Sequence, residues 1–262
     1  MRRRFAAVAV AAVVAWCVVP LRAADQPGQH AETFEKQVPV RFDYLLFLPQ
    51  DYGKDSAKKW PLIVFLHGSG ERGTDVNLVK KHGPPKIVEN KPDFPFVVVS
   101  PQCPPSKSWN SFELNALLDD VLAKYHVDKD RVYLTGLSMG GFGTWAWAMQ
   151  SADRFAAIAP ICGGGDPTMV RRLRDMPVWV FHGGADPIVP VERSRTLVEA
   201  LKEAGNTKVK YTEYPGVGHD SWTKSYDNPE LYDWFLSHKR SDRPAGEGER
   251  GKRRPKAESK KG

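Results

Sequence analysis

The stretch Arg131-Val-Tyr-Leu-Thr-Gly-Leu-Ser-Met-Gly-Gly-Phe-Gly143 decides the fold, because it joins a strand, a tight turn and a helix. Val132 to Leu134 predicts a buried strand, and Phe142 to Met149 predicts a helix. Between them, Gly136-Leu-Ser-Met-Gly140 fits the G-x-S-x-G pattern of a serine nucleophile on a sharp turn. The alternative is a glycine-rich turn of a nucleotide-binding fold. It is disfavoured because no G-x-G-x-x-G or P-loop pattern follows the strand.

Short apolar strands and helices follow one another along the rest of the chain. Besides the elbow strand we expect strands at residues 34–40, 42–48, 62–66, 96–100, 156–161, 178–181 and 208–214. We expect helices at residues 110–125, at 191–204 and from 228 onwards, and a weaker helical region at 77–90. This order predicts an α/β fold with a mostly parallel sheet of about eight strands, covered by helices on both faces. The short connection between the strands at 156–161 and 178–181 leaves no space for a sizeable lid.

Both ends of the chain differ in composition from its body. Residues 1–24 begin with three arginines in a row, followed by an apolar run and small residues, which predicts a signal peptide cut after Ala23 or Ala24. We expect a linker at residues 25–33, one catalytic domain at 34–238, and a basic, disordered tail at 239–262. The protein is therefore expected to be secreted or periplasmic, with no stable membrane anchor.

The net charge of +7 comes from the two ends of the chain. The tail carries ten Lys or Arg against four Asp or Glu, and the leader carries four Arg. The body is left with a net charge of −3. Nucleic-acid binding by the domain therefore loses its main electrostatic support.

Two cysteines, Cys103 and Cys162, would remain after removal of the leader. Each follows a predicted strand, and the two strands are expected to lie three spacings apart, roughly 14 Å. A disulfide requires Cα atoms within about 7 Å, so we expect no bridge unless the loops fold toward each other.

A serine nucleophile needs a base, and the base needs an acid that orients it. In folds with this elbow the acid and then the histidine follow the serine in the chain. Asp186 follows the strand at 178–181, and His219 follows the strand at 208–214. We therefore predict a triad of Ser138, Asp186 and His219, and the alternatives are a turn aspartate and a surface histidine.

An oxyanion hole needs two N–H groups that converge on one oxygen. We predict the backbone N–H groups of Met139 and Ser69, with Gly70 as second choice. His67, in the same loop as Ser69, is expected to be structural. Trp109 and Trp222 stand in loops at the predicted active edge, where they either stack on a substrate ring or pack between loops. No recognised metal-ligand spacing occurs, so we expect neither a metal nor a cofactor.

Several runs of the chain resemble the α/β-hydrolase superfamily, and more narrowly secreted bacterial esterases of the prolyl-oligopeptidase type. Some members of that group are called predicted peptidases or phospholipase/carboxylesterase-like proteins. The matching runs include residues 66–73, 83–86, 100–104, 136–141, 161–165, 218–222 and 228–234. The resemblance implies the strand order 1-2-4-3-5-6-7-8 and hydrolysis of small or sugar-linked esters.

Three functions are compatible with these residues. The leading hypothesis is a secreted serine esterase that forms an acyl-enzyme with small acyl, aryl or sugar-linked esters. Esters derived from plants or polysaccharides are among the expected substrates. The second is a serine peptidase acting on short peptides. The third is a non-catalytic binding protein on a hydrolase scaffold, which the complete set Ser138, Asp186 and His219 disfavours.

Overall fold

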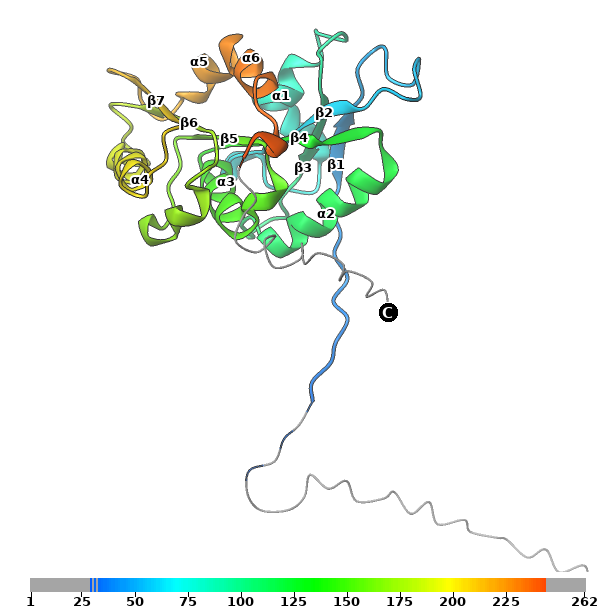
Figure 1. The fold of residues 1–262 in the computed structure, drawn as a ribbon, viewed down its shortest axis with the longest axis horizontal. Coiled ribbons are helices and arrows are strands. Elements are labelled where there is room, and N and C mark those ends of the chain that lie inside the picture. The colour runs from blue at the N-terminus through cyan, green and yellow to red at the C-terminus, as the bar shows by residue number, and fades with distance from the viewer. Residues whose placement is uncertain (1–28, 30, 32, 244–262) are drawn as a thin grey trace, which may run out of the picture. The chain divides into compact units, whose positions relative to one another are not determined.

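The computed structural model describes residues 29, 31 and 33–243 (Figure 1). By its contacts the chain divides into two units, Met1–Pro39 and Val40–Gly262. The expected signal peptide at 1–24 and most of the linker at 25–33 lie outside the described residues. Within the described residues, no helix has the length and apolar character needed to cross a membrane.

The second unit is built on one mostly parallel sheet. In the described residues its strands are β1 (Tyr44–Phe47), β2 (Trp60–Leu66), β3 (Val97–Pro101), β4 (Val127–Leu137), β5 (Ala157–Ile161), β6 (Val178–Gly183) and β7 (Val209–Tyr214). Their order is β1-β3-β2-β4-β5-β6-β7, and only β1 is antiparallel to its neighbour. The α/β-hydrolase fold is confirmed, with the implied strand order preserved except for its first strand.

The expected strand at residues 34–40 does not form. Residues 33–43 have no regular structure, and the side chains of Phe34 and Val38 are 88% and 68% exposed. Alternating apolar residues stabilise a strand only when one face is buried, and here neither apolar side chain is. Pro39 also lacks the N–H group that a sheet ladder uses.

Helices cover both faces of the sheet (Figure 1). One face packs against α2 (Ser111–Lys124), α3 (Met139–Gln150) and α4 (Glu192–Glu203). The other packs against α1 (Gly83–Ile87), α5 (Trp222–Tyr226) and α6 (Glu230–Leu236). Short 3₁₀ helices lie at Ser69–Glu71, Val76–Lys81, Ala152–Arg154, Pro167–Leu173 and Arg240–Asp242.

The double coverage explains why β2 is apolar throughout. Leu62, Val64 and Leu66 point to one core, and Ile63 and Phe65 point to the other. Strands buried on both faces lose the alternation of polar and apolar residues. The arrangement also directs the carboxyl ends of the parallel strands to one edge, where their loops meet.

The first residues of the expected tail are packed on the domain. Arg240 Nη2 lies 3.3 Å from a carboxylate oxygen of Asp130, and Arg243 donates to the Ala152 carbonyl oxygen at 2.9 Å. The polar composition of 239–262 did not indicate these contacts. Residues 244–262 lie outside the described residues.

Candidate active site

Ser138 stands on the expected turn between β4 and α3. Its φ of 52° and ψ of −116° are strained for a residue with a side chain. The turn is tight, because a Cβ atom on Gly136 would lie 2.5 Å from the Gly140 carbonyl oxygen. Glycine at both positions therefore lets the backbone close around the serine.

Ser138, His219 and Asp186 form a continuous series of hydrogen bonds. His219 Nε2 lies 3.0 Å from Ser138 Oγ, and His219 Nδ1 lies 2.7 Å from Asp186 Oδ2. Because a carboxylate only accepts, Nδ1 carries the proton and Nε2 is left to accept the serine hydroxyl. Three loops that are distant in sequence thus place an acid, a base and a nucleophile in the order that the triad chemistry requires.

Hydrogen bonds hold both oxygens of the Asp186 carboxylate. Oδ1 accepts the N–H groups of Ile188 and Val189 at 2.8 and 3.0 Å, while Oδ2 faces His219. Burial opposes ionisation, but the hydrogen bonds from His219, Val189 and Ile188 outweigh it and hold the pKa of Asp186 below its ordinary value. The group is therefore a fixed carboxylate at neutral pH.

His182 is a second histidine at Asp186 that the sequence reasoning missed. Its ring is fully buried, and Nε2 lies 2.9 Å from the Val189 carbonyl oxygen and 3.3 Å from Asp186 Oδ2. Since both of these are acceptors, Nε2 carries the proton, and Nδ1 lies 2.7 Å from the Ser194 hydroxyl oxygen. Its place at the end of a predicted strand, four residues before the acid, was the available signal.

We expect His182→Ala to lower kcat about 10- to 100-fold with little change in KM, because the loss is in the placement of Asp186 and not in substrate contact. This range corresponds to the loss of a close polar contact with a charged group, about 1–3 kcal/mol. Ester-hydrolysis kinetics on the folded variant measure it. His126→Ala, which removes an exposed ring, is the control. A raised KM at unchanged kcat would contradict the positioning role.

The predicted oxyanion donors belong to two segments that touch. Met139 is the first residue of α3, so its N–H group has no acceptor within the helix. Ser69 opens the 3₁₀ helix after β2, and Gly70 follows it. A Cβ atom on Gly68 would lie 2.8 Å from a side-chain carbon of Leu137, which places this loop against the elbow.

His67 and Trp109 support that loop. The buried His67 accepts the Cys103 N–H at Nε2 (2.9 Å) and lies 2.6 Å from the Gly68 carbonyl oxygen through Nδ1. Burial, the largest influence, lowers the pKa of His67, so the ring is neutral and Nδ1–H donates. Trp109 donates to the His67 carbonyl oxygen at 3.2 Å and covers Gly143. These contacts support the structural role expected for His67. For Trp109 they favour packing between loops over stacking on a substrate ring.

Trp222 lies between His219 and a further histidine, His82. Its ring centroid is 5.2 Å from that of His219 and 5.4 Å from that of His82, both in edge-on geometry. His82 Nε2 in turn lies 3.8 Å from a carboxylate oxygen of the buried Glu71. Trp222 therefore packs against His219, the predicted base, and its predicted contact with substrate stays a prediction. The sequence pattern did not indicate a role for His82, because only the Gly-Pro-Pro that follows it stands out in this region.

Both cysteines expected in the mature chain are buried and free. Within the part of the chain that the structure describes, Cys162, Asp186 and His219 make the one group whose ligand atoms could hold a metal ion, all within 4.8 Å of each other. Burial raises the pKa of the Cys162 thiol to about 12, and Asp186 and His219 are hydrogen-bonded to each other. The Cys162 thiol is protonated, and the His219 ring is already hydrogen-bonded to Asp186. The group therefore fits a hydrogen-bonded triad with an uncharged cysteine beside it better than a metal centre.

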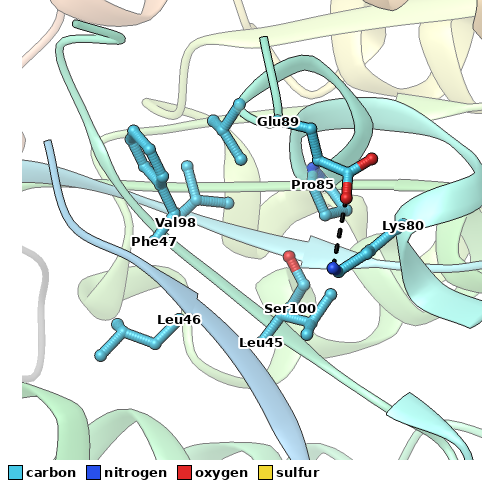
Figure 2. Close-up of a pocket in the computed structure, with 9 residues that line it drawn as sticks. Leu45, Leu46, Phe47, Lys80, Pro85, Glu89, Val98 and Ser100 are labelled. Carbon is cyan, nitrogen blue, oxygen red and sulfur yellow. Dashed lines mark ion pairs between the residues drawn. The ribbon is translucent and has the colours of Figure 1, made fainter. Parts of the chain in front are cut away.

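A separate cavity of about 280 Å³ opens between β1, β3 and α1 (Figure 2). Leu45, Phe47 and Val98 form apolar walls, and the ion pair of Lys80 and Glu89, 3.2 Å apart, lies beside them. The cavity shares no lining residue with the triad. It is therefore not part of the catalytic arrangement.

The fold and the hydrogen-bonded series define a serine hydrolase scaffold of the α/β type. The model of the phospholipase/carboxylesterase family matches residues 94–228, more than half of the chain. The chain belongs to this family. The predicted family and fold class are confirmed, and the prediction of a carboxylesterase-type hydrolase is confirmed at the level of the family.

The individual relatives match this chain over only part of their own length. A bifunctional acetylxylan esterase/xylanase of Neocallimastix patriciarum is 24% identical over 205 residues, covering 73% of this chain and 28% of its own. A probable feruloyl esterase C of Aspergillus terreus is 28% identical over 156 residues, covering 57% of each chain. The crystal structure of a thermostable esterase is 41% identical with a TM-score of 0.66, covering 75% of this chain and 59% of its own. The chain thus spans less than two thirds of these relatives.

Proposed function

We propose that this protein hydrolyses small carboxylic esters with aryl or sugar-linked groups through an acyl-enzyme on Ser138. The observation that carries the proposal is the unbroken series of hydrogen bonds from Asp186 through His219 to Ser138. The relatives named for acetylxylan and feruloyl ester hydrolysis support the substrate class. The connection between β5 and β6 holds only the 3₁₀ helix Pro167–Leu173, which supports an open site without a lid domain.

The proposed mechanism follows from the geometry. His219 Nε2 takes the Ser138 proton while Asp186 fixes the ring and stabilises the imidazolium. Ser138 Oγ attacks the ester carbonyl carbon, and the N–H groups of Met139 and Ser69 bind the oxyanion, each donor contributing about 3–4 kcal/mol. The imidazolium then protonates the leaving alcohol. Water repeats the two steps on the acyl-enzyme and releases the acid.

A substrate panel tests the proposal. We expect p-nitrophenyl acetate, p-nitrophenyl butyrate, methyl ferulate and acetylated xylose to be hydrolysed, and a matched peptide p-nitroanilide to be turned over at least about 10²-fold more slowly. Amides need a better-placed general acid for a poorer leaving group. Faster turnover of the anilide than of the esters would replace the esterase by a peptidase. No turnover of any ester would reject the proposal.

A further inference from the structure

The loop after β5 lies directly against the first turn of α3. A Cβ atom on Gly163 would lie 2.5 Å from the Gly141 carbonyl carbon, so the two backbones are in contact. The next residue, Gly164, is buried beneath the ring of Phe142, whose Cε1 would lie 2.8 Å from a Cβ at that position. The N–H of Phe142 donates to the Ser138 carbonyl oxygen at 3.0 Å. This ring therefore stands one helical turn from the nucleophile, and it is 36% exposed.

Arg193 reaches the same glycine from α4. Its Cδ would lie 3.3 Å from the Cβ position on Gly164, so the phenyl ring and the arginine stem are within about 6 Å of each other. Phe142 and Arg193 come from the elbow helix and from the helix that follows the Asp186 loop. Both side chains are exposed, and each residue is among the first four of its helix. We call the group of Phe142, Gly164 and Arg193 the Gly164 platform.

The guanidinium of Arg193 is unpaired within the described residues, where it makes neither a hydrogen bond nor an ion pair. Arg195, two residues further along the same helix, is paired with Glu213 at 2.6 Å and with Glu192 at 2.9 Å. The nearest acidic residue of the β5 loop, Asp166, accepts hydrogen bonds from the N–H and hydroxyl of Thr168. The carboxylates nearest in sequence are therefore engaged elsewhere, and Arg193 offers a free planar set of donors.

We propose that the Gly164 platform is a substrate subsite that selects esters carrying a carboxylate on an aromatic ring. The inference rests on the proposed ester hydrolysis and names a substrate class for the same site. The exposed Phe142 ring stacks on the aromatic ring of the substrate in an offset or edge-on arrangement. The guanidinium binds the carboxylate through two parallel N–H···O bonds, a geometry that a point charge does not reproduce.

The test compares substrates that differ only in charge. We expect the wild-type enzyme to prefer methyl 4-carboxycinnamate over its neutral twin, methyl 4-carbamoylcinnamate, by about 5-fold in kcat/KM, a modest factor because the site is solvent-exposed. A second pair, 4-carboxybenzyl and 4-carbamoylbenzyl butyrate, places the charge on the alcohol. Preference in either pair supports the subsite and tells which half of the ester it holds.

Two arginines provide a matched comparison. Arg193→Gln is expected to bring the ratio of kcat/KM for the charged over the neutral substrate close to one. Arg193→Lys should keep part of the preference, and Arg195→Gln should leave it unchanged. High salt should also weaken the wild-type preference, because exposed charges are screened. The ratio of two substrates on one variant does not depend on the fraction of folded enzyme.

The outcomes separate this inference from the proposed function. No preference in the wild type, a preference that survives Arg193→Gln, or an equal loss in Arg195→Gln would overturn the subsite while ester hydrolysis stands. Absence of turnover with all four esters and with p-nitrophenyl butyrate would instead reject the esterase itself.

Discussion

Replacement of Ser138 by alanine is expected to lower kcat for p-nitrophenyl butyrate by about 10⁵-fold or more, to the residual level that binding and the oxyanion donors sustain. Alanine removes the atom that forms the acyl-enzyme, and His219 then has no hydroxyl to deprotonate. The hydrogen bond between His219 Nδ1 and Asp186 at 2.7 Å does not involve the serine and should persist. Steady-state hydrolysis with an active-site titration of the wild type measures the loss.

The other triad members should give a graded result. Asp186→Asn is expected to cost about 10⁴-fold in kcat, because an amide at this position favours the wrong tautomer of His219. An enzyme that carries both Asp186→Asn and Ser138→Ala should have a kcat no lower than that of Ser138→Ala alone, because the effects of residues that act as a unit do not add. Ser56→Ala, in an exposed turn, serves as the control. A Ser138→Ala enzyme with more than a few percent of wild-type activity would remove this serine from the mechanism.

Gly140→Ala is expected to have the largest effect on stability. The added Cβ atom would lie 1.9 Å from the Leu66 carbonyl oxygen and 2.7 Å from that of His67. Both contacts are to backbone, so the end of β2 or the elbow helix has to move. We expect a loss of about 3 kcal/mol or more in the free energy of unfolding. Activity in the folded fraction should also fall, because the loop with the predicted oxyanion donor Ser69 follows these residues.

Urea denaturation measures the effect of Gly140→Ala. Gly70→Ala is the matched control for stability, because a Cβ atom there meets nothing within 4 Å. If both variants unfold at the same urea concentration, close backbone contact does not explain the glycine at position 140.

The fold was largely predictable because its strands are buried on both faces. Apolar runs such as Leu62 to Leu66 admit few other interpretations, and the helix at 110–125 forms as α2 with Asn110 as its cap. The alternation at 34–40 looked like a further strand, but alternation does not say whether a neighbouring strand will cover the apolar face. Here Phe34 and Val38 stay exposed.

The site was predictable where chain order carries the information. Ser138, Asp186 and His219 lie together in the structure because each follows a strand whose carboxyl end reaches the same edge. His182 and the Gly164 platform depend on side-chain contacts between loops, which no spacing in the sequence encodes. The supporting role of Trp109 likewise became clear only from its hydrogen bond to His67.

Covalent labelling tests the central claim most directly. The intact enzyme is treated with a fluorophosphonate, and the modified residue is found by mass spectrometry of tryptic peptides, where residues 132–154 form one peptide. The account predicts one phosphonyl group per chain on Ser138, with loss of ester hydrolysis in proportion to labelling. Complete inactivation with the label on another residue, or full activity after labelling of Ser138, would contradict it.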